Sequence, residues 1–201
     1  INGAQDFYGV KPDLTTFGKA MSNGFSLAAV CGKKDIMKLG SIEFKGEERV
    51  FLLSTTYGAE MMSLGAFIAT VEFLKKRNVI KKIWKYGFKF KKIFNSISEE
   101  LKISKFIKCY GPACAPYYFC KNKKLKISNK FKTLFLQEMA KNRILISPSW
   151  ISFSYSHGNK ELEITKKALK KTLLVYKKAI SKGINKYLKS DVVKPVFRKY
   201  N

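Results

Sequence analysis

Residues 10–20 have the sequence VKPDLTTFGKA, and this segment decides the fold expected for the whole chain. Pro12 and Asp13 favour a turn, and the β-branched residues after them predict a short strand over residues 14–17. The small residues on both sides of Lys19 indicate a second turn, so we expect this lysine on a buried loop. A buried lysine is costly unless it is paired, neutral or covalently bound, and enzymes use such lysines to form Schiff bases. Lys19 is therefore the first candidate for a catalytic residue.

A second candidate site lies at the start of a predicted helix. Ser54, Thr55 and Thr56 follow a predicted strand over residues 50–53 and come just before a helix that begins near Gly58. Hydroxyl groups and backbone N–H groups at a helix N-terminus can bind a phosphate. The alternative is an ordinary N-cap, which is the commoner role of serine and threonine at this place. Thr55 and Thr56 are thus candidates for phosphate contacts.

The sequence predicts an α/β arrangement in the first third, followed by a long helix and an α+β unit, with a boundary near residues 95–105. The small apolar residues at 26–31 suit a buried strand. The other expected elements are helices at 35–39, 58–73, 79–101 and 130–142, two strands within 106–120, strands at 144–147 and 150–155, and a last helix that Asn159 caps and that continues toward Leu188.

The formal net charge of +26, taken alone, favours a nucleic-acid-binding surface. Only four of the 40 basic residues are arginine, although arginine is the residue that binds phosphates and bases in a bidentate manner. The lysines are also spread from Lys11 to Lys199 with no single basic block. We therefore interpret the charge as a solvated helix surface.

The cysteines and the termini exclude several classes of protein. Four cysteines, at positions 31, 109, 114 and 120, match no zinc-binding pattern, and the only histidine, His157, is far from them in sequence, so no metal site is expected. The chain has neither a signal peptide nor an apolar run of the roughly 18 residues that a membrane span needs. We expect a cytoplasmic protein with reduced thiols, and a first residue, Ile1, that lies within a domain of a longer protein.

Residues 10–20 resemble the signature of class III aminotransferases, a long ordered motif around one lysine. In that family the lysine binds pyridoxal 5'-phosphate (PLP) through an imine, so the resemblance gives this role to Lys19. Further along, the family has a threonine at a helix start that contacts the cofactor phosphate of the neighbouring subunit. That position matches Thr55, with Thr56 as the adjacent alternative. The resemblance continues through residues 144–157 and covers essentially the whole chain.

The resemblance implies the PLP-dependent transferase fold of type I, of which this chain is the C-terminal half. Residues 1–100 would form the last part of the large PLP-binding domain with the long helix, and residues 101–201 the small α+β domain. The family's aspartate that pairs with the pyridine nitrogen would precede Ile1, and Asp6 does not match it, so the chain alone is expected to be inactive. The intact enzyme would be a homodimer with an active site shared between subunits, and it would bind neither nucleic acid nor membranes.

Within this family the sequence is similar to glutamate-1-semialdehyde 2,1-aminomutase, and residues 51–60 and 194–198 resemble a branch associated with polysaccharide and nucleotide-sugar biosynthesis. The favoured function is transamination from a small-molecule amino donor to a carbonyl acceptor, with the Lys19 amine as general base and acid. One alternative is the aminomutase reaction, which moves an amino group within one substrate. Another is a non-catalytic chain or a basic nucleic-acid-binding protein.

Overall fold

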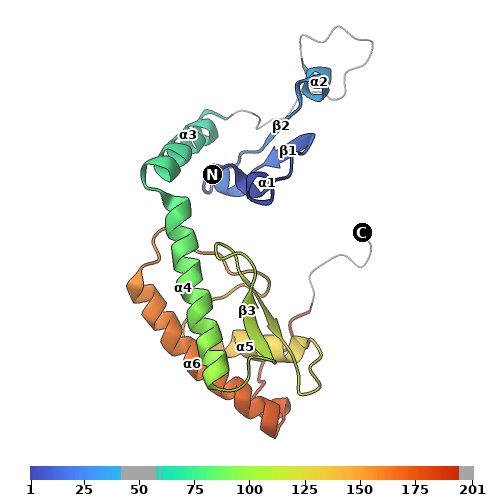
Figure 1. Ribbon diagram of the computed structural model, residues 1–201, viewed down its shortest axis with the longest axis vertical. Helices are drawn as coiled ribbons and strands as arrows, with labels where there is room; N and C mark the ends of the chain where they lie inside the picture. The colour runs from blue at the N-terminus through green and yellow to red at the C-terminus, as the bar shows by residue number, and fades with distance from the viewer. Residues whose placement is uncertain (42–57, 59, 195–201) are drawn as a thin grey trace. The chain divides into compact units, whose positions relative to one another are not determined.

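The computed structural model describes residues 1–41, 58 and 60–194 (Figure 1). Contacts divide the chain into two compact units, Ile1–Val79 and Ile80–Asn201. Nearly all of the long predicted helix therefore belongs to the second unit. The predicted domain boundary at residue 100 refers to the domains of an intact family member. These compact units do not test it, and it stays a prediction.

The first unit is built around a β-hairpin. Its elements are α1 (Gly3–Tyr8), β1 (Leu14–Phe17), the 3-10 helix η1 (Lys19–Met21), β2 (Ala29–Gly32), α2 (Lys34–Met37), the 3-10 helix η2 (Lys38–Gly40) and α3 (Met61–Lys76). The strand predicted at 14–17 and the helices predicted near 35–39 and 58–73 are confirmed. The short helix α1 was not predicted, although Gly9, which ends it with a left-handed φ of 67°, is a typical helix stop.

β1 and β2 pair antiparallel, with Leu14 opposite Gly32 and Phe17 opposite Ala29. Asp13 fixes the open end of this hairpin, since its carbonyl accepts a hydrogen bond from the Lys33 N–H at 3.0 Å and its carboxylate contacts the Lys33 ammonium. A side chain at Gly32 would collide with the Asp13 backbone. The hairpin thereby places residues 18–28 as one connecting loop.

The prediction of a buried strand at 26–31 is wrong in two respects. The strand covers only Ala29–Gly32, and three of its four residues are exposed. The physical reason is that the hairpin has two strands and no second layer over it among the residues that the structure describes. Apolar side chains on it, such as Leu14, Phe17 and Val30, stay 40–52% exposed.

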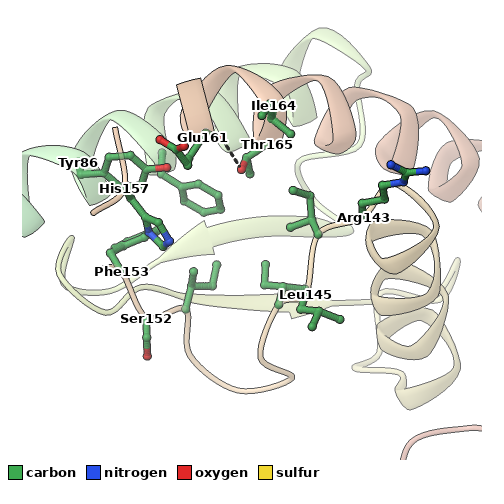
Figure 2. Close-up of a pocket in the computed structure, with 13 residues that line it drawn as sticks. Tyr86, Arg143, Leu145, Ser152, Phe153, His157, Glu161, Ile164 and Thr165 are labelled. Atoms are coloured by element: carbon green, nitrogen blue, oxygen red, sulfur yellow. Dashed lines mark hydrogen bonds between the residues drawn. The ribbon is translucent and has the colours of Figure 1, made fainter. Parts of the chain in front are cut away.

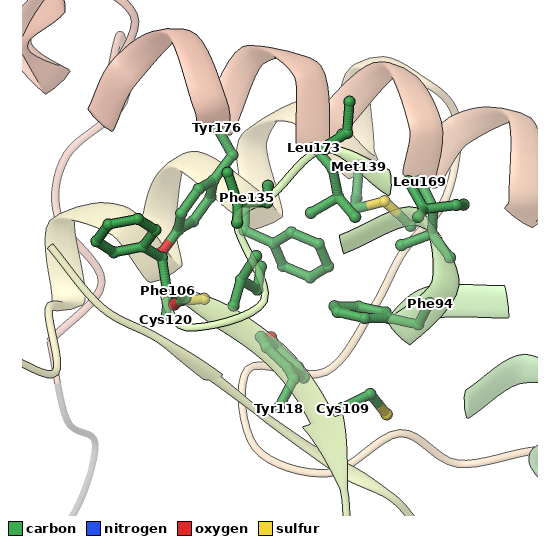
Figure 3. Close-up of a cluster of buried hydrophobic side chains, with 14 of the residues drawn as sticks. Phe94, Phe106, Cys109, Tyr118, Cys120, Phe135, Met139, Leu169, Leu173 and Tyr176 are labelled. Atoms are coloured by element: carbon green, nitrogen blue, oxygen red, sulfur yellow. The ribbon is translucent and has the colours of Figure 1, made fainter. Parts of the chain in front are cut away.

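The second unit contains the hydrophobic core of the described chain (Figure 3). Its elements are α4 (Val79–Glu100), β3 (Ile107–Tyr110), β4 (Tyr117–Cys120), α5 (Asn129–Lys141), α6 (Asn159–Lys182) and the 3-10 helix η3 (Ile184–Lys186). The periodicity-based predictions of α4, the hairpin, α5 and α6 are confirmed, although Gly158 and not Asn159 is the N-cap of α6. Figure 3 shows side chains from α4, α5, α6 and both strands meeting in one cluster, with Phe94, Phe135 and Leu169 fully buried in it.

The strands predicted at 144–147 and 150–155 do not form in this chain. Only one isolated bridge joins this region to the hairpin, between Trp150 and Tyr117. The Ile151 N–H also donates to the Pro116 carbonyl at 2.8 Å, and the Tyr118 hydroxyl donates to the Ser147 carbonyl at 2.8 Å. The segment is thus attached beside β4 at a few points without becoming a third strand.

Three helical side chains make hydrogen bonds to backbone groups outside their own helix. Asn95 on α4 receives the Cys109 N–H and donates to the Cys109 carbonyl, both at 2.9 Å, and so satisfies the outer edge of β3. Gln137 on α5 contacts the chain after α6: it donates to the Tyr187 carbonyl and accepts from the Lys189 N–H at 2.7 Å. Thr133, one helical turn earlier, accepts from the Val193 N–H at 2.9 Å.

The positive charge is concentrated in one unit. Residues 80–201 contain thirty basic and six acidic residues, a net charge of +24, whereas residues 1–79 contain ten and eight, a net charge of +2. The expectation of lysines spread along the chain therefore needs correction, because basic residues are denser in the second unit. No helix of the described residues is long and apolar enough to cross a membrane.

Candidate functional site

Lys19 lies where the hairpin strand β1 ends and the connecting loop begins. It is the first residue of η1, and its backbone has the left-handed φ of 52°, which non-glycine residues rarely adopt. Such a conformation costs about 1–3 kcal/mol, so it persists only where neighbouring contacts impose it. Five other described non-glycine residues, Lys102 among them, also have a positive φ, so this conformation marks a tight turn and does not by itself single out Lys19.

Hydrogen bonds within the loop hold this conformation. The Met21 N–H donates to the Gly18 carbonyl and the Ser22 N–H to the Lys19 carbonyl, at 3.3 and 3.4 Å. Ser22 is almost fully buried, and its hydroxyl donates to the Phe25 carbonyl. This hydrogen bond closes the turn from Ser22 to Phe25, which follows Lys19 in the loop.

The expected burial of Lys19 is wrong for this chain, because its side chain is exposed. The reason is the one that exposes β2: the described part of the first unit has no layer over the hairpin. Among the described residues, the Lys19 ammonium has no hydrogen bond or ion pair, and it is free to contact a ligand. Thr55 and Thr56 lie outside the described residues.

A cavity of about 310 Å³ lies beside the hairpin in the first unit. Gln5 of α1 and Thr15 of β1 meet at its wall through a 2.9 Å hydrogen bond between the Thr15 hydroxyl and the Gln5 amide oxygen. Phe17 and Cys31 add apolar surface. Lys19 is not one of its lining residues, so the cavity is adjacent to the candidate lysine in sequence and does not contain its amine.

A second cavity, of about 340 Å³, lies within the second unit (Figure 2). Figure 2 shows Tyr86, His157 and Glu161 gathered at one end and Arg143 at the other. Burial raises the pKa of the Tyr86 hydroxyl, with the Glu161 carboxylate as a smaller cause. The Glu161 carboxylate accepts the Gly158 N–H at 2.8 Å, and this bond holds the pKa of Glu161 below its usual value.

Sequence reasoning did not find this second group of polar residues. Arg143 has a left-handed φ of 62° just after α5, and this position could have been recognised as a helix end. His157 is held by the Ser154 N–H, which donates to its Nδ1 at 3.2 Å, and its ring lies 5.5 Å from that of Tyr86. These contacts connect side chains from α4 and the start of α6, and no local motif indicates them.

Comparison with known proteins identifies a matching family and solved structures with a similar fold. Residues 3–169 match the family model "Aminotransferase class-III". Similar solved structures include a transaminase with PLP bound, with a TM-score of 0.78 and 19% identity over 89% of this chain and 42% of that one. An omega-transaminase from Sphaerobacter thermophilus has a TM-score of 0.75 and 20% identity over 87% of this chain and 41% of that one.

Curated relatives give the same family with more than one activity. The chain is 28% identical to a 3-aminobutyryl-CoA aminotransferase of Cloacimonas acidaminovorans over 90% of its own length. It is 31% identical to a glutamate-1-semialdehyde 2,1-aminomutase of Thermodesulfovibrio yellowstonii over 84% of its length. The chain spans 42% and 40% of these two relatives. From the family match over residues 3–169, we conclude that the chain belongs to the class-III aminotransferases, a PLP-dependent enzyme family.

Proposed function

We propose that Lys19 is the residue that binds PLP covalently in a whole protein that transfers an amino group from a small-molecule donor to a carbonyl acceptor. The observation that supports this most directly is the position of Lys19, an accessible amine on a strained turn at the end of β1. A primary amine is the group that reacts with an aldehyde, and no described residue forms an ion pair with Lys19, so the residue fits the cofactor.

When bound, PLP supplies an electron sink that stabilises negative charge on the substrate carbon. The contribution of the chain lies at Nζ of Lys19. This nitrogen holds the cofactor before the donor arrives, and once released it takes a proton from the substrate carbon next to the amino nitrogen and later returns it. The turn closed by Ser22 keeps the lysine backbone in place during both roles.

Thr55 and Thr56 complete the proposal as phosphate contacts. Their support is the sequence pattern before α3 and the family match, which includes both residues. We propose that Thr55 reaches the cofactor of a neighbouring subunit, so that the active enzyme is a homodimer. The acceptor class to screen first is the keto sugars, because residues 51–60 and 194–198 resemble the nucleotide-sugar branch.

The aminomutase reaction is the second candidate, since several curated relatives carry that name. A transaminase converts its donor to a keto acid only when a carbonyl acceptor is present. A mutase converts glutamate-1-semialdehyde to its isomer without any acceptor. Product analysis with and without an acceptor therefore separates the two reactions.

The test of Lys19 uses the longest natural polypeptide that contains residues 1–201. The protein is incubated with PLP, reduced with borohydride and digested, and the peptides are analysed by mass spectrometry. We expect the pyridoxyl phosphate group on the Lys19 peptide of the wild type and of Lys11→Ala, an exposed lysine on the same unit. Lys19→Ala should retain none. A label distributed over many lysines, or an unchanged amount of label in Lys19→Ala, would contradict the proposal that Lys19 binds PLP.

A further inference from the structure

Residues 144–146 have the alternating burial of a strand but pair with no strand among the described residues. Ile144 and Ile146 are half-buried and pack against the core, whereas Leu145 between them is 94% exposed. This alternation is the side-chain pattern of an extended chain lying on a hydrophobic layer. The same segment was predicted as a strand from its sequence, because Ile, Leu and Ile precede the break at Pro148.

Most of the backbone groups of this segment have no partner among the described residues. Within the part of the chain that the structure describes, the N–H and C=O groups of Leu145 and Ile146 make no hydrogen bond. Ile144 donates only to the end of α5, at the Met139 carbonyl, with a distance of 3.0 Å. Unpaired backbone groups on an apolar edge are a template for another strand, and native proteins usually cover such an edge.

Both edges of the two-stranded β3–β4 sheet have partners, and residues 144–146 belong to neither edge. Asn95 occupies the outer edge of β3 with its paired bonds to Cys109, and the Lys91 ammonium contacts the Gly111 carbonyl beyond it. On the opposite side, β4 has the bridge to Trp150. The protein thus protects β3 with polar side chains but leaves residues 144–146 without any such cover.

A groove lies beside the open segment. The lining of the 340 Å³ cavity of Figure 2 includes all three residues of the segment and three further apolar residues, Phe90, Phe153 and Ile164. Leu145 and Arg143 are drawn at the same end of this groove. An added strand at the segment could therefore place its own apolar side chains in the groove.

From these observations we propose that residues 144–146 accept an extended segment as an added β-strand, and that this segment belongs to the part of the family fold that the chain does not span. The chain covers 42% of its curated relative and 42% of a similar solved structure, so more than half of such a protein remains to supply the strand. The segment should be apolar at alternate positions, to fill the groove, and acidic overall, because residues 80–201 have a net charge of +24. The proposal does not depend on the role of Lys19.

Hydrogen–deuterium exchange tests the pairing directly. The peptide that contains residues 145–147 is followed in the 201-residue chain and in the longest natural polypeptide that contains it. We expect rapid exchange in the chain alone and exchange slowed by about 100-fold in the longer protein, as strand pairing protects amides. A peptide around Leu169 and Leu173, which are fully buried on α6, should be protected in both and serves as the folding control.

Two matched variants separate backbone pairing from side-chain packing. Leu145→Pro removes the N–H that an added strand would use, while Leu145→Val keeps it and has high strand propensity. In the chain alone neither variant should change exchange in α6, because the Leu145 N–H has no partner there. In the longer protein only Leu145→Pro should restore rapid exchange at Ser147, whose N–H would lie on the same edge of the strand as that of residue 145.

Three outcomes would overturn the proposal. The first is equally rapid exchange at residues 145–146 in a longer protein whose α6 peptide is protected. The second is protection in the chain alone that grows with concentration, which would assign the edge to a second copy. The third is loss of protection in Leu145→Val as well as Leu145→Pro, which would indicate packing and not strand pairing. If the amides of the segment are protected in the longer protein but PLP does not label Lys19, this inference holds and the proposed role of Lys19 is wrong.

Discussion

Asn95 provides the sharpest test of how the second unit is held together. Its amide makes two 2.9 Å hydrogen bonds to the backbone of Cys109, a residue with no exposed surface. Asn95→Ala leaves a buried N–H and a buried C=O without partners. Each such group costs about 1–3 kcal/mol, so we expect the free energy of unfolding to fall by about 2–6 kcal/mol.

Urea unfolding followed by tryptophan fluorescence measures the free energy of unfolding of the second unit. The two tryptophans, Trp84 and Trp150, both lie in the second unit, so their emission reports that unit. Ser96→Ala, at an exposed position next to Asn95 on the same helix, is the control and should change stability by less than about 0.5 kcal/mol.

An isosteric variant tests the hydrogen bonds and not the volume. Asn95→Asp keeps the acceptor for the Cys109 N–H but sets a carboxylate against the Cys109 carbonyl. It should be destabilised at pH 7 and recover part of the loss near pH 4, where a protonated carboxyl can donate. If Asn95→Ala were as stable as Ser96→Ala, the account of this edge would be refuted.

Two further predictions concern buried polar atoms. Thr172 has a fully buried hydroxyl oxygen without a hydrogen-bond partner among the described residues. Thr172→Val should therefore leave the urea midpoint unchanged or raise stability by about 1 kcal/mol. A clear loss of stability would show that the hydroxyl has a partner. Burial raises the pKa of the Cys109 and Cys120 thiols from 9.0 to about 12, so their neutral form contributes stability below pH 9 that is lost as the pH rises toward 12. At pH 8 a thiol reagent should therefore modify the exposed Cys31 quickly and reach Cys109 and Cys120 only on unfolding; rapid modification of either buried thiol in folded protein would contradict this.

The elements that could be predicted are those with local signals. The stripe of apolar residues in α4 and the turn at Gly111 between the strands of the hairpin are properties of neighbouring residues, and both elements formed where expected. Segments 26–31 and 144–147 have equally clear strand patterns. The first formed only the exposed strand Ala29–Gly32, and the second formed no strand. A buried strand also needs a neighbour and a covering layer, which are not encoded within the segment.

The candidate site shows the same limit. The motif around Lys19 singles out the residue, and its left-handed backbone agrees with the predicted turn. Its burial could not be predicted, because burial depends on what packs over the hairpin. The Tyr86–His157 contact and the hydrogen bonds of Asn95 to Cys109 were missed because both join residues far apart in sequence.

The contacts of α5 with the chain after α6 have a mechanical consequence. Gln137 bonds to Tyr187 and Lys189, and Thr133 bonds to Val193, although this stretch has little regular structure beyond η3. A pulling force applied at residue 194 would therefore load α5 through these side chains first. The last turn of α6, only a few residues earlier in the chain, would be shielded from that force until the clamp on α5 gave way.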